Sequence, residues 1–185
     1  MRVVAGSVRG FQLVVPSGKK TRPTSNRIKE TLFNILQWDI AGSCFLDLFS
    51  GSGGIAIEAL SRGAKEAVLV EQDREAVRCI KENIKHTRME DSSRVMAMDV
   101  MQALRRLEQS GQVFDIIFMD PPYHKNLEEK IISYLLRSSL VKQESLIIVE
   151  TALDTDVTYM QDFDCTVERI KEYKSNRHVF LRVEK

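Results

Sequence analysis

From residue 43 onward the sequence alternates short apolar runs with longer amphipathic stretches, and this alternation most limits the folds open to the chain. The apolar runs predict strands at 44–49, 67–71, 94–98, 114–119 and 145–149. The stretches between them predict helices at 54–62, 74–86, 100–109 and 127–137. Continuous apolar strands separated by helices are typical of parallel sheets covered on both faces. The pattern therefore predicts a doubly wound, Rossmann-like α/β fold with right-handed crossovers.

The two ends of the chain depart from this alternation. The strand-like runs 165–170 and 178–183 are joined by a short polar turn, so they must pair antiparallel. They would complete a seven-stranded, mostly parallel sheet with an antiparallel C-terminal strand. At the other end, residues 1–5 and 11–15 flank a glycine-containing segment and predict a small β-hairpin. Thr24 or Ser25 is then placed to cap the first helix.

Charge is distributed unevenly along the chain. The formal net charge is only +1, but residues 1–30 hold seven basic side chains and one acid and so carry +6. The rest of the chain carries −5. A basic arm on an acidic body suggests a polyanionic partner. The 185 residues are enough for one compact domain. We divide the chain into a basic hairpin and arm, 1–25, and an α/β domain, 26–185.

Several classes of protein are excluded. No apolar run approaches the roughly 18–20 residues of a membrane helix, and no secretory signal is recognisable. Cys44, Cys79 and Cys165 lie far apart without a CxxC or Cys/His cluster, which predicts reduced thiols and no metal site. We expect a cytoplasmic protein, without membrane contact and monomeric.

The first strand runs directly into a glycine-rich loop, and the segment Gly51-x-Gly53-x-x-Ala56 fits a nucleotide-binding fingerprint. Glu71 follows Gly51 by twenty residues, at a strand end, where an acid can bind ribose hydroxyls. Since strand, loop, helix and acid are all in register, a ligand site is favoured over a plain tight turn. The fingerprint alone does not identify the nucleotide.

Asp47 separates the possible ligands. Four residues before the first glycine, its carboxylate would repel the diphosphate of NAD, whereas the ammonium and sulfonium of S-adenosylmethionine are cationic. Asp99, at the end of the third strand, is placed to accept a hydrogen bond from an adenine amino group, to cap the following helix, or to do both. The acids therefore favour S-adenosylmethionine as the ligand.

The fourth strand leads into the tetrapeptide Asp120-Pro121-Pro122-Tyr123. The lone pair of an exocyclic base amine is delocalised into the ring, so the amine is a poor nucleophile. The Asp120 carboxylate and the Pro121 carbonyl can accept its two N–H groups, favour a pyramidal nitrogen and stabilise the developing positive charge. The prolines hold these acceptors still, and Tyr123 offers a face on which a flipped base can stack. A rigid turn without a ligand is the alternative.

Taken together, these motifs resemble the class I methyltransferases that act on amino groups, and the chain is similar over nearly its whole length to the bacterial 16S ribosomal RNA guanine-N2 methyltransferases. The resemblance rests on the segments 2–10 (RVVAGSVRG), 21–27 (TRPTSNR), 32–36 (LFNIL), 47–54, 57–64 (IEALSRGA) and 114–123. At 52–55 the family often has Gly-Ser-Gly followed by Ala, whereas this chain has Ser-Gly-Gly-Ile. All of these residues but the isoleucine are small, so the departure puts little in doubt.

The resemblance implies methyl transfer from S-adenosylmethionine to the N2 amine of a guanine in 16S ribosomal RNA, guanine 966 in the family, during maturation of the small subunit. It implies that the base is received by Asp120, Pro121, Pro122 and Tyr123. The expected donor-binding residues are Arg22, Thr24, Asp47, Phe49, Ser50, Gly51, Ser52, Gly53, Glu71, Gln72, Asp99 and Val100. The expected contacts to phosphates of 16S ribosomal RNA or of an assembling 30S subunit are Arg2, Arg9, Lys19, Lys20, Arg27, Lys29, His124 and Lys125.

Three alternatives stay open. The same tetrapeptide would serve an enzyme that methylates adenine N6 in DNA or another RNA, although the short chain leaves no room for a DNA-reading domain. An NAD-dependent oxidoreductase would share the sheet and the glycines but conflicts with Asp47. An RNA-binding protein without catalytic activity would keep the basic arm but has no use for Asp120 and the prolines that follow it.

Overall fold

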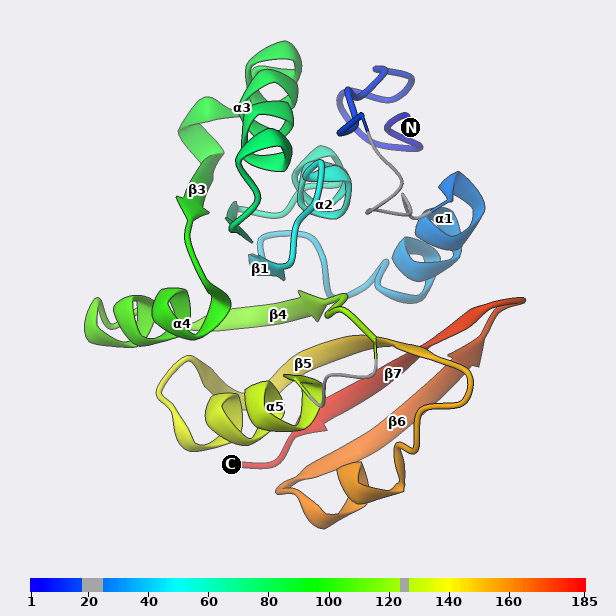
Figure 1. Ribbon diagram of the computed structural model, residues 1–185, viewed down its shortest axis with the longest axis vertical. Coiled ribbons are helices and arrows are strands. Elements are labelled where there is room, and N and C mark those ends of the chain that lie inside the picture. Colours follow the sequence, from blue (N-terminus) through cyan, green and yellow to red (C-terminus); the bar gives the residue numbers. More distant parts are fainter. Residues whose placement is uncertain (18–24, 124–126) are drawn as a thin grey trace. The chain divides into compact units, whose positions relative to one another are not determined.

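The computed structural model describes residues 1–17, 25–123 and 127–185, and it divides into two compact units, Met1–Val100 and Met101–Lys185 (Figure 1). Most elements lie within two residues of their predicted bounds, but the strand predicted at 145–149 is longer and spans Val141–Ala152. Parallel pairing prevails, and the C-terminal strand is antiparallel. The predicted α/β class is therefore confirmed. The division at residue 25 stays a prediction.

The first unit contains three parallel strands in the order β3-β2-β1. The strands are β1 (Cys44–Leu48), β2 (Glu66–Glu71) and β3 (Ser93–Ala97). The helices are α1 (Asn26–Ile35), α2 (Gly54–Ser61), α3 (Arg74–Thr87) and the short 3₁₀ helix η1 (Glu90–Ser92). The predicted alternation of strands and helices is present here. β1 and β2 are almost wholly buried, as their continuous apolar runs predict, whereas α3 buries one face only, as its amphipathic pattern predicts.

Local signals in the sequence set the ends of the helices. The Ser25 hydroxyl accepts a hydrogen bond from the Ile28 amide (3.2 Å) and caps α1, as predicted for one of the two candidate residues. Asp73 caps α3 in the same way, through the amides of Glu75 and Ala76. Thr24, the other candidate cap of α1, lies outside the described residues.

The N-terminal segment forms the predicted hairpin, though in a minimal form. Arg2 and Gln12 make one antiparallel bridge, and the Val3 amide donates to the Phe11 carbonyl (2.9 Å). Further along, the Asn83 side chain on α3 makes paired bonds of 2.8 Å to the amide and the carbonyl of Val14. Side chains of the first unit, rather than a long strand ladder, therefore hold the arm in place.

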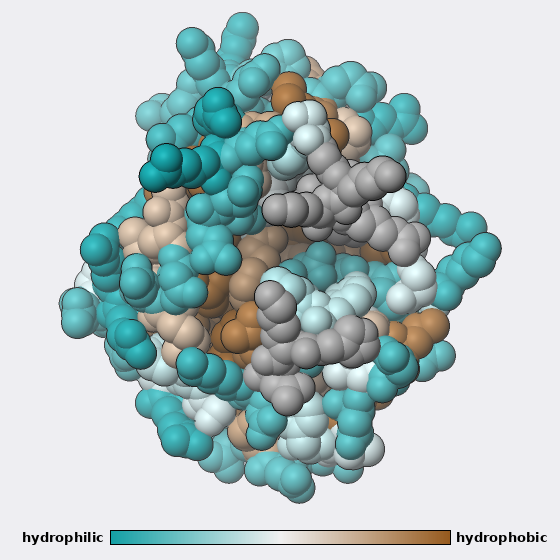
Figure 2. Space-filling model, in the orientation of Figure 1, coloured by the Kyte–Doolittle hydropathy of each residue, from teal (hydrophilic) through white to brown (hydrophobic). Residues whose placement is uncertain are grey.

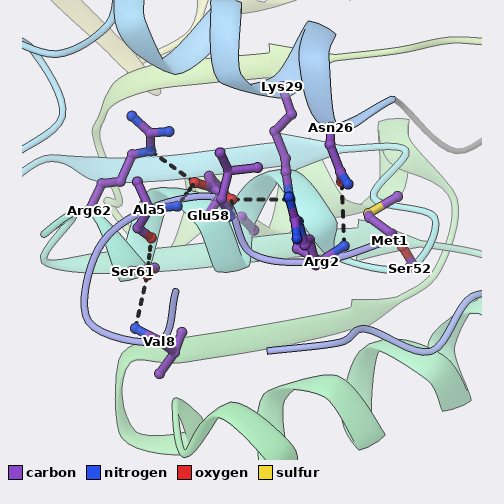
Figure 3. A network of polar contacts seen from close by, with 12 residues as sticks. Met1, Arg2, Ala5, Val8, Asn26, Lys29, Ser52, Glu58, Ser61 and Arg62 are labelled. Atoms are coloured by element: carbon purple, nitrogen blue, oxygen red, sulfur yellow. Dashed lines mark hydrogen bonds and ion pairs between the residues drawn. The ribbon is translucent and has the colours of Figure 1, made fainter. Parts of the chain in front are cut away.

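Close backbone contact with α2 explains one glycine in the arm. Gly6 has φ +85°, and a Cβ built on it would lie 1.8 Å from the Ser61 carbonyl oxygen. The next amide, of Ser7, donates to that same carbonyl (2.8 Å). The Ser61 hydroxyl in turn accepts from the Val8 amide (3.2 Å; Figure 3). Only glycine permits this approach of the arm to the end of α2.

A buried carboxylate also holds the arm. The Glu58 carboxylate on α2 is completely buried and accepts from the amides of Val4 (2.8 Å) and Ala5 (2.9 Å). It also pairs with the Lys29 ammonium (3.0 Å) and the Arg62 guanidinium (2.9 Å; Figure 3). Burial lowers the pKa of Lys29, and the attraction of Glu58 opposes that shift. One carboxylate thus joins the arm, α1 and α2.

The second unit is built on four strands in the order β4-β5-β7-β6. The strands are β4 (Phe114–Met119), β5 (Val141–Ala152), β6 (Cys165–Glu172) and β7 (Asn176–Val183). The helices are α4 (Val100–Gln109), which begins at the last residue of the first unit, α5 (Leu127–Arg137) and the 3₁₀ helix η2 (Thr158–Asp162). β4 and β5 are parallel, and β7 runs antiparallel to both of its neighbours, as predicted. β5, β7 and β6 lie side by side in Figure 1.

The face of the molecule shown in Figure 2 is largely polar. Hydrophilic side chains cover most of the face in Figure 2, with smaller apolar areas between them. None of the helices in the described part of the chain combines the length and the apolar character of a membrane span.

We expect the substitution Glu58→Gln to lower the free energy of unfolding by about 3–5 kcal/mol, because it leaves the buried Lys29 ammonium without its counter-charge. Lys29→Met should cost clearly less, since Glu58 keeps Arg62 and two amide donors. Urea denaturation measures both, with the exposed Lys65→Met as the control. Equal losses for the two variants would contradict this account of the network.

Candidate active site

The glycine loop connects β1 to α2 through a strained backbone. Phe49, Gly51 and Gly53 have φ of 65°, 55° and 79°, in the left-handed region. Phe49 is the informative one, because a non-glycine residue adopts this conformation only where its surroundings impose it. The Ser50 amide donates to the Val70 carbonyl (3.0 Å) and the Gly53 amide to the Ser50 carbonyl (2.7 Å). These bonds fix the path of the loop.

Glycine is required at two positions in this loop for different reasons. A Cβ on Gly53 would come within 3.0 Å of a Leu69 methyl group, so the helix N-terminus packs directly on β2. A Cβ on Gly51 would meet no atom of the described residues within 4 Å, so the backbone there borders space that these residues leave open. Open space beside a left-handed glycine allows a ligand to approach the main chain closely.

Asp47 lies beneath this loop and is 1% exposed. Its Oδ2 accepts from the Ala56 amide in the first turn of α2 (3.3 Å). Burial raises the pKa of Asp47 to about 8, and repulsion from Glu71 adds to the shift, while the Ala56 and Ser50 hydrogen bonds oppose it. A cation bound next to this acid would stabilise its ionised form and lower its pKa. The buried acid is therefore suited to bind a positively charged group.

Glu71 closes the loop from β2. Its Oε2 accepts from the Gly51 amide (2.9 Å), and its Oε1 accepts from the amides of Gln72 (2.8 Å) and Asp73 (2.9 Å). The residue predicted to bind ribose therefore also shapes the loop. A carboxylate has about four acceptor sites, so the three amides leave it capacity for a hydroxyl.

The other predicted donor-binding residues of the first unit follow the carboxyl ends of β1, β2 and β3. Ser52 and Val100 are buried, while Gln72 and Asp99 are exposed. Asp99 directly precedes α4. The structure thus brings the glycine loop and Glu71 into contact, and it places Asp47 below them. Arg22 and Thr24 lie outside the described residues.

In the second unit the tetrapeptide follows β4 directly, as predicted. Asp120 is half-buried, Pro121 is buried and Pro122 is exposed. Tyr123 is 38% exposed, and its hydroxyl donates to Glu150 Oε1 on β5 (3.2 Å). The residue expected to stack on a base therefore keeps part of its surface in solvent while its hydroxyl is held by the protein.

A polar cluster behind Tyr123 was not predicted from the sequence. Glu150 accepts from the Asn176 side chain (2.5 Å) and pairs with His178 Nε2 (3.0 Å). All three side chains are buried, at 6%, 4% and 0% exposure. The available signal was an acid at the end of the apolar run of β5, but the histidine has no partner nearby in the sequence. Only the pairing of β5 with β7 brings them together.

The predicted RNA-contacting residues divide into three groups. Arg2, Arg9 and Arg27 are exposed, as the prediction requires. Lys29 is a correction: it is fully buried against Glu58 and cannot reach a phosphate. The other predicted contacts lie outside the described residues; they are Lys19, Lys20, His124 and Lys125. Among the described residues, no group of three or more His, Cys, Asp and Glu could hold a metal ion.

Comparison with known proteins identifies the family. The family model described as Conserved hypothetical protein 95 matches residues 1–182. The protein named ribosomal RNA small subunit methyltransferase D of Haemophilus influenzae is 39% identical over 155 residues, 83% of this chain and 80% of that protein. The protein of the same name from Escherichia coli K12 is 37% identical over 154 residues, 83% of this chain and 76% of that protein.

A solved structure is similar to the chain over the same length. A hypothetical protein from Thermus thermophilus superposes with a TM-score of 0.84 at 34% identity, over 99% of each chain. The similarity therefore extends over nearly the whole length in sequence and in structure. The chain belongs to the Conserved hypothetical protein 95 family.

Proposed function

We propose that this protein transfers a methyl group from S-adenosylmethionine to the N2 amine of a guanine in the RNA of the small ribosomal subunit, with guanine 966 of 16S ribosomal RNA as the target. The observation that carries the proposal is the match, over 83% of this chain, to relatives named ribosomal RNA small subunit methyltransferase D. The Asp120 tetrapeptide and the glycine loop, each at the carboxyl end of a strand, supply the chemistry.

The donor side fits the first unit. S-adenosylmethionine supplies an electrophilic methyl group on a sulfonium, and it carries an ammonium and no phosphate. The buried Asp47 favours a cation, and the open space at Gly51 lets the backbone contact the ligand. Glu71 keeps acceptor capacity for the ribose hydroxyls, and the exposed Asp99 lies at the strand end that would receive the adenine. The diphosphate of a dinucleotide would instead disfavour the ionised form of Asp47.

The acceptor side fits the second unit. The Asp120 carboxylate and the Pro121 carbonyl accept the two N–H groups of the target amine, which directs the nitrogen lone pair away from the ring. Pro122 stiffens the backbone after these acceptors. The Tyr123 ring stacks on the base once the base leaves its helix. As the nitrogen–carbon bond forms, the bond between the sulfonium and the methyl carbon breaks, which leaves S-adenosylhomocysteine. The positive charge on nitrogen develops beside the Asp120 carboxylate, which stabilises it until the nitrogen loses a proton to solvent.

RNA contacts extend beyond the predicted arm. Five basic residues recur on α3 and its C-terminal cap at spacings of four and three, and all are exposed: Arg74, Arg78, Lys81, Lys85 and Arg88. Residues at these spacings share one face of a helix, so they form a basic stripe about 21 Å long. Glu75 on the same helix is bonded to Ser17 of the arm (2.6 Å), on the flank of the stripe. We assign phosphate binding to this stripe.

The proposal is tested by incubating the protein with labelled S-adenosylmethionine and 30S particles from a strain that lacks the activity, followed by nucleoside analysis. We expect N2-methylguanosine. Asp120→Ala should reduce the rate by at least about a hundredfold with donor affinity unchanged, because Asp120 contacts the amine and not the donor. The exposed Asp154→Ala is the control. A product methylated on adenine, or no methyl transfer at all, would refute the proposal.

Asp47 predicts a release of protons on donor binding. At pH 7 its pKa of about 8 keeps most of the carboxyl protonated without donor, and the donor's positive charge should ionise it. Calorimetry at pH 7 in buffers of different ionisation enthalpy should detect a fraction of a proton released per donor bound. Asp47→Asn should abolish the release and weaken donor binding by about tenfold or more.

The same residue predicts a pH dependence of stability in the donor-free protein. The folded-state pKa of Asp47 lies above its ordinary value of 3.8. The stabilising contribution of neutral Asp47 is therefore complete below pH 3.8 and is lost as the pH rises from there through about 8. The stability of the wild type relative to Asp47→Asn should therefore fall over this range. A constant difference would refute the raised pKa.

The basic stripe predicts a salt effect. The triple variant Arg78→Gln/Lys81→Gln/Lys85→Gln should weaken RNA binding and reduce the slope of log K against log salt by about three, roughly one per phosphate contact. Filter binding at several salt concentrations measures this slope. Arg169→Gln/Lys171→Gln/Lys174→Gln, three exposed residues of the C-terminal hairpin, removes the same charge and should leave the slope unchanged. Equal slopes for both triple variants would exclude α3 from the interface.

A further inference from the structure

The hydroxyl of Tyr123 is bound to a buried acid. It donates to Glu150 Oε1 (3.2 Å), although the residue is 38% exposed. A partly exposed tyrosine ordinarily satisfies its hydroxyl with water and keeps its rotamer freedom. Here the hydroxyl is bonded inside the second unit, which restricts the ring to one orientation.

Glu150 is equipped to hold this bond. The carboxylate is only 6% exposed, and it accepts from two further donors, Asn176 Nδ2 (2.5 Å) on Oε1 and His178 Nε2 (3.0 Å) on Oε2. Glu150 and His178 are direct partners in the register of β5 and β7. A buried carboxylate would be costly without such partners, so its position is determined by several bonds at once.

His178 is in turn fixed by two polar contacts and by packing against aromatic rings. It is fully buried, and Tyr173 Oη lies 3.3 Å from its Nδ1. With Nε2–H donating to Glu150, Nδ1 is the acceptor for the Tyr173 hydroxyl, so one tautomer satisfies both contacts. The ring also packs edge-on against Phe118 of β4 (centroids 5.7 Å apart) and lies 6.4 Å from Phe180. The histidine cannot turn without losing both polar contacts.

We propose that Glu150 is a positioning residue for the target base, acting through Tyr123, and that His178 and Asn176 hold Glu150 for this role. The inference rests on the proposed function, since it takes the Tyr123 ring as the stacking surface for the flipped guanine. A ring already fixed in its stacking orientation loses no further side-chain entropy when the base arrives. Phe118, which contacts His178, lies two residues before Asp120, so the same cluster also supports the strand end that carries the amine acceptor.

The test is a double-mutant cycle on methyl transfer to 30S particles. Tyr123→Phe keeps the stacking ring and removes its anchor, and Glu150→Leu removes the acceptor. Each should lower kcat/KM for the particle by about tenfold with donor affinity unchanged, and the double variant should lose no more than the larger single loss. Glu150→Gln keeps an acceptor oxygen for Tyr123 and should stay within about threefold of the wild type.

Tyr134→Phe is the matched control, because it removes another tyrosine–carboxylate bond of this unit, to Glu108 (2.5 Å), and should leave kcat/KM unchanged. If the losses of kcat/KM in Tyr123→Phe and Glu150→Leu add up in an active double variant, the positioning role is refuted and the proposed function is not. If Glu150→Leu does not fold, wild-type kcat/KM in Tyr123→Phe refutes it, and a tenfold loss with normal donor affinity supports it. Absence of methyl transfer in the wild type would instead refute the proposed function.

Discussion

The hydrogen bond from the Gly51 amide to the Glu71 carboxylate ties the loop after β1 to the end of β2, and the candidate donor site depends on it. Phe49, Gly51 and Gly53 are all held in the left-handed region within five residues, which an untethered loop would not maintain. Asp47 supports the loop from below through the Ala56 amide. The acids predicted to bind a ligand are therefore also the residues that build the loop around it.

A carboxylate with several donors recurs in three places, each time joining segments that are distant in sequence. Glu58 joins the N-terminal arm and α1 to α2, Glu71 joins the glycine loop to β2, and Glu150 joins Tyr123 to β7. In each case backbone amides or side-chain donors compensate the loss of hydration around the charge. These contacts specify where a segment lies, which apolar packing alone specifies less sharply.

The sequence was most informative where periodicity was strong. β4, α4 and α5 begin and end at the predicted residues, because apolar runs and amphipathic spacing report burial directly. Charge was a poorer guide. The basic residues counted near the N-terminus included Lys29, whose partner Glu58 lies 29 residues away in the sequence and buries it. The spacing of the basic residues on α3 could have been found in the sequence, but the net negative charge of residues 31–185 does not reveal it.

By itself, the sequence determined the fold class, the glycine loop, the tetrapeptide after β4 and the resemblance to amino-methylating enzymes, because each depends on residues adjacent in the chain. Tertiary structure decided which charges are buried, that Asp47 has a raised pKa, and that Glu150 and His178 stand behind Tyr123. The physical reason is that desolvation and pairing depend on neighbours brought together by strand register and helix packing, and those neighbours lie tens of residues apart in the sequence.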